Sequence, residues 1–310
     1  MTTAEIAAEK DVVGKEHWTD KKGLKLFLWE KYVGSPENKP VALFVHGSSM
    51  ASQPCFDLHV EGRPFSSAMN WFAAHGYDIW SVDMEGYGRS DKSRDITCDV
   101  SNGVDDIAAA VAYIQKLRGP RPLLMYGSSS GAIRAALFAE RHPDKVSRVA
   151  LDAFVWTGEG SPTLEQRRQR VPEFQKSNRR PIDHDFIRSV FTRDHVETTD
   201  GRVIEAFAEA TCALDTSVPT GTYLDMCLRL PLNDPTKLKA ATLIMRGQFD
   251  GIASIEDLLA FFAKLPNPDK QFSVMTGISH ASFQQRNYLV VYDILETFFA
   301  RPTPEYLSGH

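Results

Sequence analysis

The sequence predicts an α/β protein with a mostly parallel, doubly wound sheet and a helical segment inserted between two later strands. From Val41 onward, short apolar runs bounded by glycine alternate with segments of helical periodicity. Near-continuous Val/Ile/Leu runs are typical of parallel strands buried on both faces. Strand–helix alternation predicts right-handed crossovers and a parallel sheet. A chain of 310 residues is long enough to bury a large core without disulfides or metals.

The first predicted element is a hairpin, because residues 24–32 alternate in polarity and follow a polar turn at residues 20–23. Buried strands are then expected at Val41–Val45, Asp78–Asp83, Pro122–Tyr126, Val149–Val155, Thr242–Arg246 and Gln271–Met275. Helices between them are expected at Phe65–Ala74, Val104–Leu117, Ala132–Arg141, Ile255–Leu265 and Phe283–Phe299.

One long stretch, residues 157–240, interrupts this alternation. It contains no convincing strand, and residues such as Ile182, Phe186 and Val190 keep helical spacing. We therefore divide the chain into a first core part (1–156), a helical cap (157–240) and a second core part (241–310). We expect the cap to cover the carboxyl edge of the sheet.

The most informative motif is Gly-x-Ser-x-Gly at residues 127–131, which joins an apolar strand to an Ala-rich helix. A serine in such a strand-to-helix corner is strained and has its hydroxyl exposed above the sheet. Small residues on both sides are required because strand and helix pass close together, and Gly127 and Gly131 satisfy this requirement. The context predicts that Ser129 is a nucleophile.

A serine hydroxyl needs a positioned base, and that base needs a carboxylate to fix its tautomer. In sheet-based proteins the order along the chain is serine, acid, histidine. After Ser129, the strand at 243–246 leads into a loop with Asp250, and the strand at 272–275 leads into a loop with His280. All three residues follow the carboxyl ends of strands, where open α/β sheets build their sites. We predict a triad of Ser129, His280 and Asp250.

Asp152 competes with Asp250 for the role of the acid, because it ends the strand that follows the nucleophile helix. An equally good interpretation is that Asp152 is a buried residue at the end of a strand, hydrogen-bonded for structural reasons. We favour Asp250.

Acyl transfer also requires two backbone N–H groups facing the carbonyl oxygen. Ser130, directly after the nucleophile, is predicted to supply one of them. The strand ending in His46-Gly47 places Ser48 to supply the other, with Ser49 as a nearby substitute.

Together these motifs resemble the α/β-hydrolase superfamily over nearly the whole chain. The matching segments are His46-Gly47, Asp83–Ser90, Gly127–Gly131, His142–Val146, Gly247–Asp250 and Ser279-His280. The resemblance implies the α/β-hydrolase fold and a Ser-His-Asp triad but does not identify a substrate. Glu85 stands where the family often has arginine. The serine excludes the haloalkane dehalogenase and epoxide hydrolase branches, which use an aspartate nucleophile.

The leading functional interpretation is a serine hydrolase of the carboxylesterase or lactonase type, acting on a small-molecule ester or lactone through an acyl-enzyme. A C–C bond hydrolase or lyase would use the same triad. A proline-type aminopeptidase is less favoured, because no acidic cluster is evident to bind a substrate amine. A non-catalytic ligand receptor on a hydrolase scaffold is the alternative of a different class.

We expect the cap to determine substrate choice. Trp156, Tyr223 and Phe56 are the candidate substrate-binding residues, because the last core strand, the cap and the oxyanion loop should converge near them. The loop between Ser49 and Phe65 is a further candidate wall. The basic run in the cap is interpreted as solvated helix faces, with attraction of an anionic substrate as the alternative: Arg167, Arg168, Arg170, Lys176, Arg179 and Arg180.

Composition limits which classes of partner and which cellular compartment are expected for this protein. A net charge of −5 and a pI of about 6.0 argue against nucleic acid or an anionic membrane as partner. The four cysteines are scattered, which predicts free thiols in a reducing compartment. Met1–Gly14 lacks the apolar region of a signal peptide, and no long apolar run exists, so we expect a cytoplasmic protein. No metal or cofactor is implied, and the oligomeric state is left open.

Overall fold

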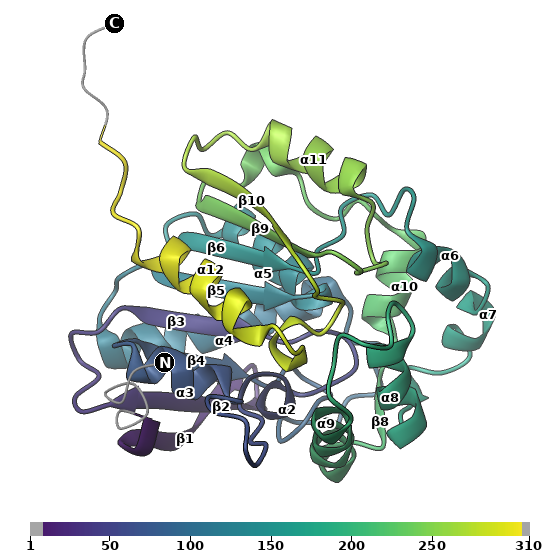
Figure 1. The fold of residues 1–310 in the computed structure, drawn as a ribbon, viewed down its shortest axis with the longest axis horizontal. Coiled ribbons are helices and arrows are strands. Elements are labelled where there is room, and N and C mark those ends of the chain that lie inside the picture. Colours follow the sequence, from purple (N-terminus) through teal and green to yellow (C-terminus); the bar gives the residue numbers. More distant parts are fainter. Residues whose placement is uncertain (1–8, 306–310) are drawn as a thin grey trace, which may run out of the picture.

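The computed structural model describes residues 9–305. Its centre is an eight-stranded sheet in the order β1-β2-β4-β3-β5-β6-β9-β10 (Figure 1). β2 pairs antiparallel with β1 and β4, and the other neighbours pair in parallel, so the predicted mostly parallel sheet is confirmed. The strands are β1 Val12–Lys21, β2 Leu24–Val33, β3 Val41–Val45, β4 Asp78–Val82, β5 Leu123–Ser128, β6 Val146–Asp152, β9 Ala241–Gly247 and β10 Lys270–Met275.

Helices cover both faces of the sheet because successive strand residues point to opposite sides. In β3, Leu43 and Val45 belong to the apolar cluster shared with helices α4, α5 and α11. Ala42 and Phe44 belong to the cluster shared with α3 and α12. The helices are α2 Ser52–Phe56, α3 Ala68–Ala74, α4 Val100–Arg118, α5 Ser130–Arg141, α11 Ile255–Lys264 and α12 Tyr288–Ala300.

The predicted hairpin is confirmed as β1 and β2, and each expected core strand is present with small shifts at its ends. The helix expected over Phe283–Phe299 is divided. A short 3-10 turn, η2, covers Ser282–Gln284, and α12 begins only at Tyr288. The side chain of Gln285 accepts hydrogen bonds from the amide and hydroxyl of Ser279, which ties this break to the loop before it.

The segment between β6 and β9 gathers at one end of the sheet, on the right in Figure 1. It contains α6 Pro162–Arg168, α7 Val171–Phe174, β7 Arg179–Pro181, α8 His184–Thr192, α9 Gly201–Leu214, β8 Ser217–Pro219, α10 Gly221–Leu228 and η1 Pro235–Lys237. The expectation of no strand here is wrong, because β7 and β8 pair antiparallel. Three-residue strands are too short to leave an alternating pattern in the sequence. α8 and α9 form their own apolar cluster with Met50 and Leu58 of the core.

Within residues 9–305, no helix has the length and apolar character needed to cross a bilayer. The interpretation of Met1–Gly14 falls mainly on residues outside the described range. Cys55, Cys98, Cys212 and Cys227 are all unpaired, as predicted.

Candidate active site

Ser129 occupies the corner between β5 and α5, as its motif predicts. Its backbone has φ +58° and ψ −125°, a region that residues with a side chain rarely adopt. The two flanking glycines make the corner feasible. A Cβ atom on Gly127 would overlap the carbonyl of Gly131, and one on Gly131 would overlap the carbonyl of Val45 in β3.

We expect Gly131→Ala to destabilise the fold by about 3 kcal/mol or more, because its new methyl group meets backbone that cannot rotate away. Urea denaturation would measure this. Gly201→Ala in α9 is the matched control, since its Cβ atom has nothing within 4 Å, and its stability should change by less than about 0.5 kcal/mol. Equal stability of the two variants would show that the corner is not tightly packed.

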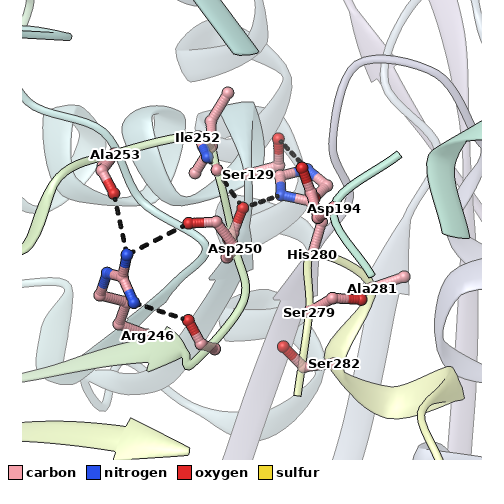
Figure 2. A network of polar contacts seen from close by, with 12 residues as sticks. Ser129, Asp194, Arg246, Asp250, Ile252, Ala253, Ser279, His280, Ala281 and Ser282 are labelled. Atoms are coloured by element: carbon pink, nitrogen blue, oxygen red, sulfur yellow. Dashed lines mark hydrogen bonds and ion pairs between the residues drawn. The ribbon is translucent and has the colours of Figure 1, made fainter. Parts of the chain in front are cut away.

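The structure brings Ser129, His280 and Asp250 into one hydrogen-bonded chain (Figure 2). Nε2 of His280 lies 3.1 Å from Oγ of Ser129, and Nδ1 lies 2.9 Å from Oδ1 of Asp250. Because a carboxylate can only accept, Nδ1–H donates to Asp250 and Nε2 is left to accept from the serine hydroxyl. The aspartate and the histidine are both buried.

The loop that carries Asp250 is held in place by Arg246, which lies near the carboxyl end of strand β9. Its guanidinium donates to the carbonyls of Gly247, Asp250 and Ala253 at 2.9, 3.3 and 3.4 Å (Figure 2). The amide of Ile252 donates to Oδ1 of Asp250 at 3.0 Å. Burial by itself would raise the pKa of Asp250, but His280, the charge of Arg193 and the amide of Ile252 outweigh it and hold the pKa below its usual value.

Asp152 lies elsewhere in the hydrogen-bond network. It accepts from the hydroxyl of Tyr126 at 2.6 Å and from that of Ser282 at 3.1 Å. Among residues 9–305 it makes no hydrogen bond to His280. Burial, with a further contribution from Asp250, raises the pKa of Asp152 to about 7. The geometry therefore sets Asp250, and not Asp152, against the histidine.

The two predicted oxyanion residues lie on facing segments. Ser130 is the first residue of α5, where backbone N–H groups have no acceptor within the helix. Ser48 follows β3, and its hydroxyl donates to Oγ of Ser130 at 2.7 Å, which joins the two segments. A Cβ atom on Gly47 would lie 3.2 Å from Cβ of Ser129, so this loop passes directly beside the nucleophile.

His46 supports the oxyanion loop from inside the protein. Its Nδ1–H donates to the carbonyl of Gly47 at 2.8 Å, and Nε2 accepts from the amide of Met84 at 3.0 Å. Burial, reinforced by the charge of Arg134, lowers the pKa of His46 to about 3. A neutral imidazole can accept at one nitrogen and donate at the other, which both bonds require.

A pocket that opens in part to solvent lies above Ser129. Tyr223 and Phe56 line it, as predicted, and the loop after Ser49 adds a wall through Met50 and Cys55. The full lining is Gly47, Ser48, Ser49, Met50, Cys55, Phe56, Tyr126, Ser128, Ser129, Arg167, Val190, Arg193, Phe207, Tyr223, His280, Ala281, Ser282, Phe283 and Gln284.

Trp156 does not line this pocket, which corrects the expectation for that residue. Its indole packs against Phe261 of α11 and donates to the carbonyl of Asn233 at 3.1 Å. β6 ends at Asp152, and Ala153 follows with φ +50°. The chain therefore turns away from the pocket before it reaches Trp156.

Arg63 is a positioning residue that the sequence did not reveal. Its guanidinium donates to the carbonyls of Phe283, Gln284 and Gln285 at 2.7 to 3.0 Å and lies 3.9 Å over the ring of Tyr288. It thereby ties the loop before α3 to the segment that follows the catalytic-loop histidine. Only the fold makes this contact visible, because the partners are more than 200 residues apart in the sequence.

Glu85 is not at the pocket mouth. It is buried and forms ion pairs with Lys21 and Arg94 at 2.6 and 2.5 Å. Burial opposes its ionisation, but the bonds from Arg94 and Lys21 lower the pKa of Glu85 to about 2. In the described part of the chain, no group of three or more His, Cys, Asp or Glu side chains is arranged to hold a metal ion.

The sequence matches a known protein family and two curated relatives. Residues 59–287 match the family described as serine aminopeptidase, S33. Two proline iminopeptidases of Neisseria meningitidis, one of serogroup A and one of serogroup B, are each 28% identical over 123 residues. This match covers 40% of the present chain and 34% of each relative. The chain therefore spans about a third of the length of these curated relatives.

Solved structures share the fold at low sequence identity. A hydrolase from Pseudomonas aeruginosa PA01 has a TM-score of 0.69 and 13% identity, covering 93% of this chain and 99% of that one. E-2-(acetamidomethylene)succinate hydrolase has a TM-score of 0.68 and 19% identity, covering 93% and 100%. These similarities extend over nearly the whole α/β core and the inserted helices.

Proposed function

The chain belongs to the serine aminopeptidase S33 family of α/β-hydrolases, and from this premise we propose that it cleaves a carboxylic ester or lactone through an acyl-enzyme on Ser129. The observation that carries the proposal is the hydrogen-bonded chain from Ser129 through His280 to Asp250 at the floor of a pocket. Its order and spacing match what an activated serine requires.

In the first half of the reaction, Oγ of Ser129 attacks the substrate carbonyl while Nε2 of His280 takes the hydroxyl proton. Asp250 stabilises the imidazolium through Nδ1–H. The carbonyl oxygen gains negative charge, and the backbone amides of Ser48 and Ser130 stabilise it by donating hydrogen bonds to it. His280 then returns its proton to the leaving alkoxide, and the alcohol departs.

The second half repeats these roles with water as the nucleophile. His280 takes a proton from water, the resulting oxygen nucleophile attacks the acyl carbonyl, and the serine oxygen leaves with the proton. The acid product is released and Ser129 is restored. In a lactone, the leaving alcohol stays attached to the acyl group, so only one product forms.

An aminopeptidase function is less well supported by the pocket. A substrate with a free amine needs an acidic side chain near the cleavage point. Among the described residues that line the pocket there is no aspartate or glutamate, and two arginines are present. This charge pattern favours esters over N-terminal amines, despite the names of the two Neisseria relatives.

A substrate panel tests the proposal. The intact protein would be incubated with activated esters, lactones, prolyl amides and vinylogous diketones, and turnover would be followed together with the protein mass. We expect ester or lactone turnover and a mass increase equal to one acyl group. Turnover confined to prolyl amides or to diketones would replace the proposal with a peptidase or a C–C hydrolase. Absence of turnover and adduct across the panel would indicate a non-catalytic receptor.

A further inference from the structure

Two arginines of the inserted segment contact the ring of Tyr223 in the wall of the pocket. The guanidinium carbon of Arg167, on α6, lies 3.8 Å from the ring centroid, and that of Arg180, on β7, lies 3.9 Å from it. Tyr223, on α10, therefore contacts two cations that are contributed by two other elements.

Neither arginine has an anionic partner within residues 9–305. The one hydrogen bond of Arg167 goes to Sδ of Met226 at 3.9 Å. Arg180 is buried and donates through Nη2 to the carbonyl of Ser48 and the hydroxyl of Ser49, while its Nε and Nη1 have no partner. Arg180 is buried and Arg167 is half-buried, and two closely spaced positive charges in such surroundings are energetically costly without a carboxylate. Such an arrangement is typical of a site that receives an anion from outside.

A third arginine adds positive charge at the same pocket. Arg193, just after α8, lines it together with Arg167, although it is partly neutralised by Asp194 at 3.3 Å. Two nearby carboxylates are already bonded, Asp250 to His280 and Asp152 to the hydroxyls of Tyr126 and Ser282. The pocket therefore has more positive than negative charge on its walls.

We propose that Arg167, Arg180 and Tyr223 form an anion subsite, and that the substrate is an ester carrying a carboxylate at a distance from the scissile bond. This inference rests on the proposed function and names its substrate class. A guanidinium presents a planar pair of donors that matches a carboxylate. Arg167 lines the pocket directly, while Arg180 adds its charge next to the Tyr223 ring and also bonds the oxyanion loop at Ser48.

The rest of the pocket indicates which kind of chain joins the scissile ester to the free carboxylate in such a substrate. The pocket walls include apolar side chains from the core and from the inserted helices: Met50, Phe56, Val190, Phe207 and Phe283. An apolar wall favours a short aliphatic spacer over a polar one. The inferred substrate is a half-ester whose free carboxylate lies at the arginine end.

Tyr223 makes the subsite sensitive to pH. Burial alone would raise its pKa, but Arg167, Arg180, the hydroxyl of Ser49 and Arg193 together lower the pKa of Tyr223 to about 7. Above this pH the phenolate supplies its own negative charge next to the two guanidiniums and competes with the substrate carboxylate. Selectivity for a charged ester should therefore be highest below pH about 7 and decline above it.

The kinetic test compares esters that differ only in charge. One pair is 4-nitrophenyl hydrogen adipate and 4-nitrophenyl methyl adipate. A second pair, 4-(butanoyloxy)benzoate and its methyl ester, places the carboxylate on the leaving group. We expect kcat/KM to favour the charged member of at least one pair about tenfold or more at pH 6, and the preferred pair identifies the side that meets the arginines.

Variants locate the origin of this preference. Arg167→Gln should reduce the charged-to-neutral ratio of kcat/KM about 10- to 100-fold. Arg170→Gln is the matched control, because Arg170 belongs to the same basic run but is exposed and paired with Glu173, so the ratio should not change. In Tyr223→Phe the ratio should no longer decline between pH 6 and 8.5. A ratio near one for both pairs overturns the proposal while leaving ester hydrolysis itself intact.

A binding measurement keeps the inference independent of turnover. Calorimetry on Ser129→Ala would compare monomethyl adipate with dimethyl adipate, and then repeat the comparison with Arg167→Gln added. We expect the monoanion to bind more tightly, and about tenfold or more of that advantage to disappear in the double variant. If the diester binds as well as the monoanion, the anion subsite is refuted, whatever the protein hydrolyses. If no ester is turned over but the monoanion binds through Arg167, the proposed function fails and the subsite stands.

Discussion

Ser129→Ala is expected to lower kcat for any ester substrate by about 10⁴- to 10⁶-fold, because the variant has no oxygen that can form the acyl-enzyme. The fold should persist, since the change removes one hydroxyl that projects into the pocket and bonds only Nε2 of His280. Steady-state kinetics on an activated ester would measure the loss, and circular dichroism would check the fold.

Covalent labelling separates Ser129 from its neighbours. A fluorophosphonate should add once to the wild-type protein, and peptide mapping should place it on Ser129. Ser128→Ala is the control, because that residue is adjacent and lines the same pocket but, within residues 9–305, makes no hydrogen bond to His280. Label that persists in Ser129→Ala, or that maps to Ser128 or Ser130, would assign the nucleophile elsewhere.

Asp250→Asn should reduce kcat by about 10⁴-fold, as expected when an amide replaces the carboxylate that fixes the histidine tautomer. An amide can donate to Nδ1, which reverses the tautomer and leaves Nε2 protonated. The hydroxyl of Ser129 then has no base. The change is nearly isosteric, so denaturation by urea should show that the protein still folds.

Asp152→Asn is the matched variant for this prediction. Asp152 is equally buried but bonds Tyr126 and Ser282 instead of His280. With its pKa raised to about 7, it is already largely protonated below neutral pH, and asparagine resembles that neutral form. We expect its kcat at pH 6 to remain within about tenfold of wild type. A larger loss for Asp152→Asn than for Asp250→Asn, in folded protein, would reverse the assignment of the acid.

The sequence was sufficient to place the three residues of the proposed triad together, because each of them follows directly after a strand. Ser129, Asp250 and His280 come within a few residues of the ends of β5, β9 and β10, and parallel strands end at one edge of the sheet. Local sequence therefore determines where these side chains meet. The order of the motif does not distinguish Asp250 from Asp152, because both lie between Ser129 and His280 in the sequence. The hydrogen bond from His280 to Asp250 distinguishes them.

The pocket walls were predicted less well because they depend on how separate segments pack. Trp156 was misplaced by the turn at Ala153, a backbone conformation that the sequence does not signal. The basic run was interpreted as solvated helix faces, yet Arg180 lies on the short strand β7 and is buried. Arg167 faces the pocket only because α10 brings Tyr223 against it. Such contacts arise between segments and cannot be seen within any one of them.

The clamp made by Arg63 has a consequence for motion in the native state. Because one guanidinium bonds three successive carbonyls at residues 283–285, the loop before α3 cannot open without also releasing the backbone that follows His280. A second link, from the side-chain amide of Gln284 to the carbonyl of Cys55 at 2.8 Å, acts in the same direction. Amide hydrogen exchange should therefore report residues 55–66 and 281–287 as one cooperative unit with a shared opening free energy, although most of the chain separates them.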